Sequence, residues 1–404
     1  MMKLFRFIAS LCLASPACGQ ALLDSLDDMT RFDVDSAGLH ADLSFMADAT
    51  AFAAERPSQG LLSSNDRVFL SPRLLSFLDA QMGDRVLVHS QMRVDRGFDP
   101  GAASAGQVRL DEYYLQARLW KQDEVNVRIG KFATAFGSWA KRNLSWDNPL
   151  ITAPMAYEDV LPMTDGFAPG GLAGFAARRD MPDNKSGWVP IIWGPSYATG
   201  ASIFGRVGML EYAFEAKNAS LSSNPQSWDG VQDGFHTNPT VTGRIGLRPA
   251  PEWTFGTSFS HGPYLRASAS GSLPAGTSVN DYTQTTWGLD AGYTHHKWQI
   301  WSELIAARFE VPRVGAVDVL SGFVEAKYKV TPSLWAAARW NQSAFSDVPG
   351  LTTEWDRNAW RADLALGYRF SERVQVKVQY SVGDKRGNDR EGHHLGAMQV
   401  TVRF

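Results

Sequence analysis

The chain has 404 residues, and its 39 Lys and Arg against 42 Asp and Glu give a net charge of −3. It has no basic excess of the kind that binds nucleic acid, so we expect no nucleic-acid partner. After residue 19, no stretch reaches the roughly 18 uninterrupted apolar residues of a membrane-spanning helix, which excludes a helical membrane protein.

Residues 1–19 predict a cleavable secretory signal peptide. Lys3 and Arg6 precede an apolar segment at 7–14 that is too short to span a membrane, and small residues follow it. A lipoprotein signal is the alternative, because Cys18 lies near the cleavage site in a poor context for lipid attachment. Cleavage removes both cysteines and two of the 39 basic residues, which leaves 37 against 42 acidic residues and a charge of about −5.

Residues 20–40 are acidic and lack a periodic pattern. We interpret them as a periplasmic leader with room for one short helix, because a charge run of this kind is usually solvated. The remainder, residues 41–404, is predicted to form one barrel domain.

Apolar and polar residues alternate along much of 41–404, as in strands with one apolar face. The segment 373–380 alternates without interruption, and every second residue of 360–370 is apolar, ending in Tyr368 and Phe370. Such segments run to about 9–12 residues, enough for a tilted strand to cross a bilayer, whereas strands of a soluble sandwich are commonly nearer five or six. Aromatic strand ends and a charged opposite face favour an all-β, transmembrane antiparallel barrel over a soluble exported β-protein.

The pattern gives 17 candidate strands, and we predict a barrel of 16, with 14 or 18 as alternatives, because single-chain bacterial barrels use even numbers. The candidates are 41–53, 66–79, 85–95, 108–120, 124–133, 171–179, 199–208, 209–217, 240–248, 253–261, 284–294, 297–309, 319–330, 333–342, 358–370, 373–383 and 393–404. Short connections alternate with long ones rich in Ser, Gly, Asn and Pro. We expect the short turns to be periplasmic and the long loops extracellular.

One long segment, 131–197, breaks the alternation and is unusually rich in aromatic residues and proline for a solvated loop. Long ordered loops are commonly functional. In a barrel, the natural place for the apolar surface of such a loop is the lumen, where it narrows the channel. The alternative is an extracellular cap that packs on the rim.

The residues Arg128-Ile129-Gly130-Lys131-Phe132-Ala133-Thr134-Ala135-Phe136-Gly137 resemble the "GKF…T.FG" segment of the Gram-negative outer-membrane porins grouped with the phosphate-selective porins O and P. The resemblance implies a sixteen-stranded barrel, usually trimeric, with loops folded into the pore. Phosphate selectivity does not follow from it. A ladder of lumenal Arg and Lys would be needed, whereas this chain mixes signs, as in Arg93 with Asp95.

Basic residues near the long segment are the candidates for a charged ring in the pore, where point charges in a narrow polar channel would favour small anions. The best candidates are Lys131, Lys141 and Arg142, to which we add Arg128 and Arg93. Ordinary rim charges are the alternative interpretation.

The chain ends on an apolar strand face that carries Met398, Val400, Val402 and Phe404. A strand that closes a barrel can end this way, because closure removes the edge and lipid covers the outer face. The pattern resembles the terminal signal that the barrel-assembly machinery reads. We expect that machinery and outer-membrane lipid to be partners.

These features predict a porin in the cell outer membrane that allows passive diffusion of small hydrophilic solutes or ions through a water-filled channel, with no enzymatic activity and no cofactor or metal. A Ser–His site needs both side chains on one face, whereas His89 and Ser90 are neighbours in a strand and face opposite ways. Asp229, Asp233 and His236 lack the regular spacing of a calcium site. A non-transport barrel, adhesive or structural, is the alternative, and a barrel hydrolase is a more remote one.

Overall fold

The computed structural model describes residues 31–34, 38–55, 64, 66–95, 107–120, 123–184, 187–226, 238–385 and 393–404. The predicted signal peptide, most of the leader and the Asp229–His236 pattern lie outside the described residues. No helix in the described ranges is long and apolar enough to cross a bilayer.

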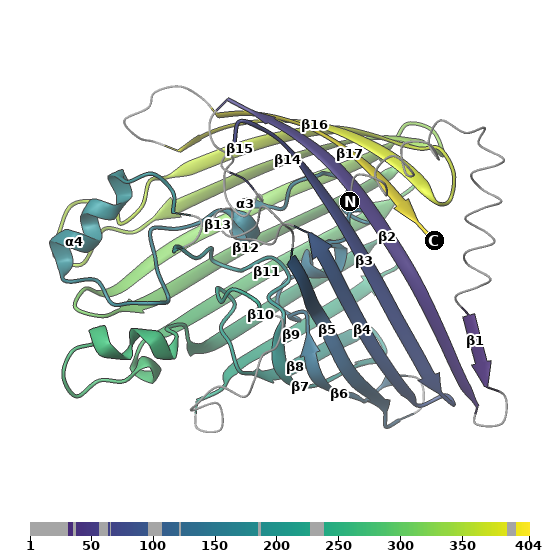
Figure 1. Cartoon of the computed structure of the whole chain (residues 1–404), viewed down its shortest axis with the longest axis horizontal. Helices are drawn as coiled ribbons and strands as arrows, with labels where there is room; N and C mark the ends of the chain where they lie inside the picture. Colours follow the sequence, from purple (N-terminus) through teal and green to yellow (C-terminus); the bar gives the residue numbers. More distant parts are fainter. Residues whose placement is uncertain are drawn as a thin grey trace.

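Sixteen antiparallel strands form a closed barrel, and a seventeenth short strand, β1 (Arg31–Val34), precedes them (Figure 1). The barrel strands are β2 (Leu39–Ala54), β3 (Val68–Met82), β4 (Val86–Asp95), β5 (Gln107–Arg118), β6 (Asn126–Phe132), β7 (Ala198–Val207), β8 (Leu210–Lys217), β9 (Thr240–Ala250), β10 (Trp253–Pro263), β11 (Thr283–His295), β12 (Trp298–Val311), β13 (Gly315–Lys329), β14 (Leu334–Phe345), β15 (Ala359–Arg369), β16 (Val374–Lys385) and β17 (His393–Arg403). Each strand pairs with the next in sequence. The prediction of a 16-stranded antiparallel barrel is therefore confirmed.

The barrel closes where β17 pairs with β2, with Met398 opposite Ala51 and Arg403 opposite Met46. The last residue continues this seam. Phe404 exchanges backbone hydrogen bonds of 2.6 and 2.9 Å with Phe45, and their rings stack at 5.4 Å. Closure pairs the backbone groups that an open sheet would expose at its edge.

The first residues of β2 extend beyond the end of β17, and β1 pairs with this remaining edge. Arg31 lies opposite Asp42, and Val34 lies opposite Leu39. A strand within the predicted leader was not expected from the sequence, where an acidic segment with at most a short helix was predicted. Its backbone pairing covers an edge that β17 leaves open.

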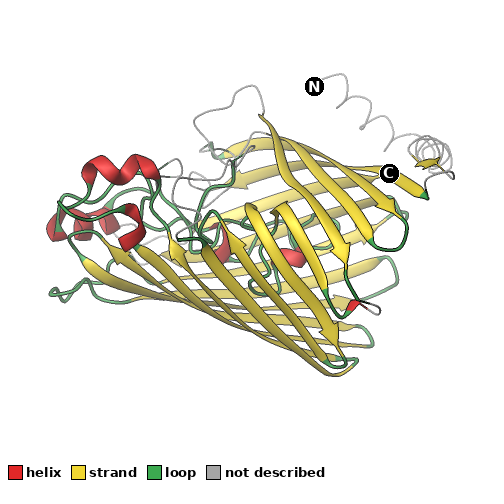
Figure 2. Ribbon diagram, turned by 90° about the horizontal axis from the view of Figure 1, so that it is seen from below, coloured by secondary structure: helices red, strands yellow, loops and turns green. Residues whose placement is uncertain are grey.

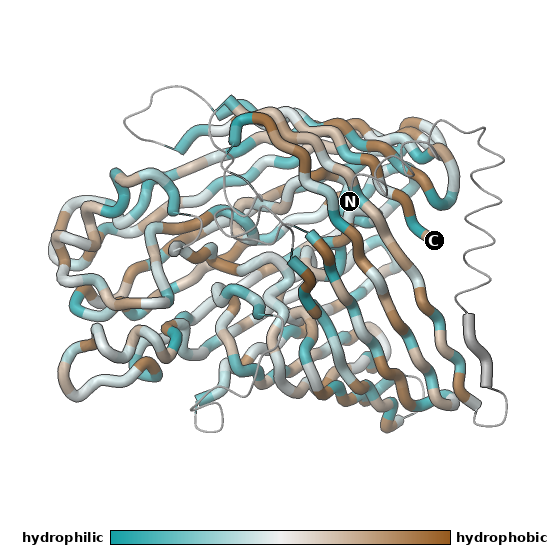
Figure 3. Tube along the Cα trace, in the orientation of Figure 1, coloured by the Kyte–Doolittle hydropathy of each residue, from teal (hydrophilic) through white to brown (hydrophobic). Residues whose placement is uncertain are grey.

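Hydropathy alternates along the strands, as Figure 3 shows. In β15, Arg361, Asp363 and Ala365 are buried on the inner face, whereas Leu364 and Leu366 are more than half exposed on the outer face. The outer wall therefore carries the apolar residues and the inner wall most of the charges, as predicted.

The two ends of the barrel differ in the length of their connections. The short-turn end has the connections 83–85, 119–125, 208–209, 251–252, 296–297, 330–333 and 370–373. The long-loop end has 55–67, 96–106, 133–197, 218–239, 264–282, 312–314, 346–358 and 386–392. One connection departs from the predicted alternation, because only Pro312, Arg313 and Val314 join β12 to β13 at the long-loop end.

The predicted strand at 171–179 is wrong. This segment forms helix α4 (Leu172–Ala176) followed by a 3₁₀ helix, η4 (Ala177–Asp180). Leu172, Phe175 and Ala176 have the spacing of one helical face and pack against the same apolar cluster, which favours the helix. Its removal from the 17 candidates leaves the 16 observed barrel strands.

Gly367 of β15 lies against the indole of Trp335, and a β-carbon added there would come within 2.0 Å of the ring. We predict that Gly367→Ala destabilises the barrel by about 1–3 kcal/mol, because the rigid ring must move. The measurement is the urea midpoint of unfolding in detergent. Gly396→Ala is the matched control, since only a backbone oxygen at 3.8 Å approaches a β-carbon there. Equal midpoints for the two variants would contradict this packing argument.

Candidate functional site

The lumen loop, residues 133–197, joins β6 to β7, and its part around α3 (Met155–Glu158) lies inside the barrel, where Figure 2 also shows short helical segments. The loop contains two short helical turns, η3 (Ala140–Arg142) and α3, in addition to α4 and η4. Its contacts with inward-facing side chains of the wall, described below, confirm the prediction that the loop folds into the lumen. The α4 segment lies at the long-loop end (Figure 1).

Carboxylates on the wall bind the first part of the loop through its backbone. Glu112 of β5 accepts a hydrogen bond of 2.7 Å from the Ala133 amide. Glu303 of β12 accepts three, each of 2.7 Å, from the Ser138 and Trp139 amides and the Ser138 hydroxyl. Charge-assisted hydrogen bonds of this kind are stronger than neutral ones, so they fix the path of the loop.

Glu303 also binds the returning part of the loop, through the hydroxyl of Tyr157. Burial raises the pKa of that hydroxyl well above its usual value, and the charge of Glu303 raises it further. Tyr157 therefore keeps its proton and donates a hydrogen bond to the carboxylate. One buried Glu303 thus joins two stretches of the loop to the same strand.

The middle of the loop reaches the closing seam. The Ser145 hydroxyl donates to Asp48 of β2 at 2.6 Å, and the same carboxylate accepts from Thr401 of β17 at 2.7 Å. Arg73 of β3 pairs with Asp48 at 2.6 Å. The ammonium of Lys377 on β16 donates to three loop carbonyls, those of Ser145, Asn148 and Leu150, at 2.8–3.0 Å.

Two arginines of the wall bind the loop between β13 and β15. Arg339 is fully buried, pairs with Glu325 at 3.2 Å and Asp363 at 2.9 Å, and donates to the backbone of Thr152 and Ala153 at 3.0 and 2.9 Å.

Its neighbour Arg361 pairs with Asp363 at 3.0 Å and with Glu158 of α3 at 2.7 Å. Because breaking a buried pair leaves an uncompensated charge, this network holds the loop strongly.

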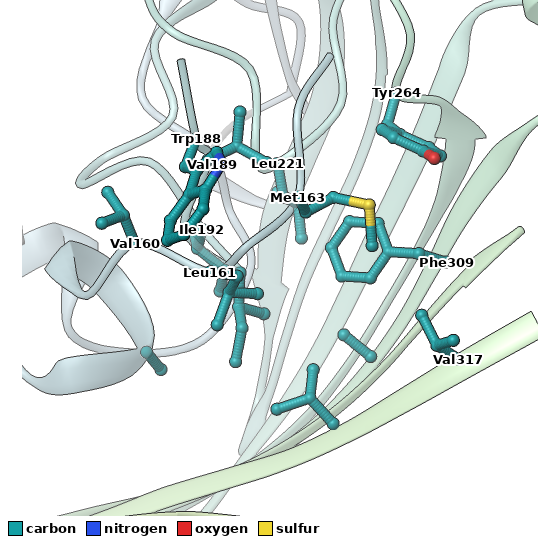
Figure 4. Packing of buried hydrophobic residues seen from close by; sticks show 14 of the residues in the cluster. Val160, Leu161, Met163, Trp188, Val189, Ile192, Leu221, Tyr264, Phe309 and Val317 are labelled. Carbon is teal, nitrogen blue, oxygen red and sulfur yellow. The ribbon is translucent and has the colours of Figure 1, made fainter. Parts of the chain in front are cut away.

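An apolar cluster holds the second half of the loop against β12 and β13 (Figure 4). Phe309 and Val317 face inward from the wall and are fully buried, in contact with loop residues such as Met163 and Ile192. This stretch of inner wall is apolar, although the strand pattern predicts inner faces that are polar or small. The loop therefore packs here as a protein core does, and not as a solvated flap.

A charged cluster joins the loop to the neighbouring connections at the long-loop end. Lys385, the last residue of β16, pairs with Asp356 at 3.2 Å and with Asp183 at 3.4 Å. Burial raises the pKa of the nearby Asp159 to about 7, although Lys385 partly offsets this effect. Asp159 therefore titrates near neutral pH.

The structure separates the five basic residues predicted for the pore. Lys131 is fully buried and donates to the carbonyls of Leu110, at 2.9 Å, and Gln226. Arg142 pairs with Glu325 at 2.7 Å and stacks on Trp301 at 4.0 Å. The charges of Lys131 and Arg142 are thus directed to partners within the protein.

Arg93 and Arg128 lie on the part of the wall formed by β4 to β6. Arg93 pairs with Asp111 at 3.1 Å, and Arg128 stacks on Tyr114 at 4.4 Å. Lys141 is exposed, and no ion pair joins it to any described residue. Of the five, Lys141 is the one whose side chain is exposed and forms no ion pair within the described part of the chain.

Three of the predicted assembly residues, Met398, Val400 and Val402, lie on β17, and Phe404 follows its last residue. Met398 is half exposed on the outer face, and Phe404 stacks on Phe45 at the seam. Val400 is partly buried, and Val402 is buried beside Ala47 and Val374.

Sequence reasoning missed the residues that hold the loop, above all Glu303, Arg339 and Lys377. Each stands on an inner face, where the sequence indicates only a lumenal charge. Arg361 and Asp363 place opposite charges on one face of a strand in the sequence, and this alternation is the one signal of the network. The register that brings Arg339 opposite Asp363 comes from the paired strands.

No protein-family model and no curated protein matches the chain. Solved structures do match its fold. The anion-selective porin from Comamonas acidovorans aligns with a TM-score of 0.58 and 11% identity, over 91% of this chain and 100% of that chain. The outer-membrane channel DcaP of Acinetobacter baumannii aligns with a TM-score of 0.57 and 13% identity, over 92% and 99%. A loop-deletion mutant of OmpT from Vibrio cholerae aligns with a TM-score of 0.58 and 11% identity, over 91% and 100%. The fold is thus that of the outer-membrane porins, and the resemblance to the phosphate-selective class stays a prediction.

We predict that Arg339→Ala costs about 3 kcal/mol of folding free energy, because the buried Glu325 and Asp363 lose the cation they share and keep only Arg142 and Arg361, respectively. Arg308→Ala is the control. Arg308 makes a similar pair with Asp318 at 2.7 Å, but on the exposed surface, so its loss costs about 0–1 kcal/mol. Urea unfolding measures both variants, and limited proteolysis reports release of the loop. Similar losses in the two variants would argue against the buried network.

Proposed function

We propose that the protein is an outer-membrane porin that lets small hydrophilic solutes or ions diffuse passively through its barrel. The observation that carries the proposal is a closed barrel with a polar inner wall and a long loop bound inside it by wall side chains. A loop fixed in this way narrows the channel inside the barrel and sets its width. Flow is driven by the solute gradient.

The location and orientation follow from the same features. Apolar side chains cover the outer wall, and the predicted signal peptide would direct export. By analogy with barrels of this kind, the short-turn end faces the periplasm and the long-loop end faces outward. In this proposal, the partners of the protein are the barrel-assembly machinery, outer-membrane lipid and the transported solutes.

Trimeric assembly is part of the proposal. The outer face of β2 carries Ala47, Ala49, Ala51 and Ala53, which form a flat surface that permits close approach of a second barrel. The mass of the solubilised protein, measured by light scattering, decides between trimer and monomer.

Lys141 supplies a charge filter in this proposal. A unit charge acts on an ion 4 Å away with about 1 kcal/mol even in water, so Lys141→Glu should change the anion-to-cation permeability ratio by roughly fivefold or more, toward cations. The measurement is the reversal potential of purified protein in a planar bilayer under a low-salt gradient. Lys297→Glu, at a short turn outside the loop, is the control and should have a smaller effect.

The same experiment tests the proposed function. Wild-type protein should give stepwise single-channel currents, and absence of current across salts and voltages would refute a porin. An unchanged reversal potential in the Lys141 variant would remove that residue from the ion path.

A non-transport barrel is the second candidate, and one observation favours it. Inward-facing residues at several levels of the barrel, such as Thr286, Asn341 and Gln375, are fully buried, so the loop and wall fill much of the lumen. Electrical silence of a correctly folded barrel would support this adhesive or structural role.

Phe404 is proposed to act in assembly. Deleting it removes the stack on Phe45 and two backbone hydrogen bonds at the seam. We expect export to continue while the heat-modifiable folded form in outer membranes falls severalfold. Phe404→Tyr keeps the aromatic ring and should assemble normally. Normal insertion of the deletion would contradict the assembly role.

A further inference from the structure

Three basic side chains gather on the inner wall at the short-turn end, beside the lumen loop. Lys327 lies near the end of β13, and Arg369 and Arg403 are the last residues of β15 and β17. All three follow the inward-facing alternation of their strands. They therefore face the same side of the lumen at its short-turn end.

Aromatic rings hold these cations. Trp146 of the lumen loop lies 4.7 Å from the guanidinium carbon of Arg369 and 4.1 Å from that of Arg403. The ammonium of Lys327 lies 4.9 Å from the ring centre of Trp335. A guanidinium group stacked on a ring is oriented by it, while its in-plane N–H groups stay free to donate.

The cations lack carboxylate partners. Among the described residues, no ion pair forms with Lys327, Arg369 or Arg403, and Arg403 donates instead to the backbone carbonyl of Glu372 at 2.9 Å. The Nε–H of Arg369 is buried and has no hydrogen-bond partner in the described chain. A buried donor without a partner is costly unless a ligand or water satisfies it.

Two other cations at the same end, Arg118 and Arg248, are neutralised. Arg118 pairs with Asp123 at 2.7 Å, and Arg248 pairs with Glu211 at 3.3 Å. Near the three unpaired cations, the lumen loop supplies one exposed carboxylate, that of Asp147, which acts on Lys327 and Arg403 electrostatically. The wall between β13 and β17 therefore carries a local excess of positive charge.

We propose that Lys327, Arg369 and Arg403 form an oxyanion-binding subsite for small solutes that bear a carboxylate or sulfate group. Trp146 is the positioning residue that aligns the two guanidinium groups. Their planar donor edges match the paired oxygens of such anions, which a spherical chloride lacks. The subsite deepens the proposed function, because it rests on a lumen that solutes can enter.

The test is titration of the purified, folded protein in detergent with sodium sulfate or sodium acetate over a constant chloride background, by calorimetry and tryptophan fluorescence. We expect saturable binding of at least one of these anions. The double variant Arg369→Gln with Arg403→Gln should bind about tenfold or more weakly, because two charge-assisted donors are lost. Lys297→Gln, at the same end but beside Tyr328, should bind as wild type does.

Two further variants separate a binding site from a general charge effect. Asp147→Asn removes the neighbouring carboxylate and should strengthen binding severalfold. Trp146→Phe keeps a stacking ring and should retain the calorimetric signal, while the fluorescence change is lost. Heat-modifiability on gels confirms that each variant is folded.

Absence of saturable binding in wild type, or equal binding by the double variant, would overturn the subsite. If the protein binds sulfate but not acetate, the subsite recognises sulfate-type groups. If it binds acetate but not sulfate, the subsite recognises carboxylates. Protein that binds the anion but carries no current supports the subsite and refutes the pore. Protein that conducts without binding either anion overturns the subsite alone.

Discussion

The structure depends on how the polar backbone of the lumen loop is satisfied away from bulk water. A loop of irregular conformation inside a barrel exposes amides and carbonyls that no ladder can pair, and each unpaired group is costly. Here the wall provides the missing partners. Glu303 accepts the amides of one turn, and Lys377 donates to three carbonyls of another. The charged inner wall is thus a template for the loop as much as a lining for a channel.

This template joins segments that lie far apart in the sequence. Arg339 stands between the loop backbone and two carboxylates on neighbouring strands, and Arg361 links that group to α3. The apolar cluster around Phe309 then anchors the returning half of the loop. The two kinds of anchor have different roles. The polar anchors set the position of the loop, and the apolar anchors bury its apolar surface.

The fold was largely predictable, because alternation with a period of two residues can be recognised within each strand, without knowledge of its neighbours. The helix at Leu172–Ala176 was mistaken for a strand, since a short segment with small residues satisfies both periods until its packing against Trp355 is known. The site was less predictable. Lys131 and Arg142 look like lining residues in sequence, but register and loop path bring each to a partner. Arg339 and Glu303 could not be singled out, because inner-face charges look alike until the strands are paired.

Asp48 brings together β2, β3, β17 and the middle of the loop. The first and last barrel strands are therefore tied on the inside by a segment from the first half of the chain. Parting β2 from β17 breaks the Thr401 contact and separates the loop anchors on β2 from those on β16. Opening of the wall and release of the loop are thus one cooperative event. In the reverse direction, a folding barrel gains the full set of loop contacts only when β2 and β17 pair. The lumen loop therefore stabilises the closed barrel over the open sheet.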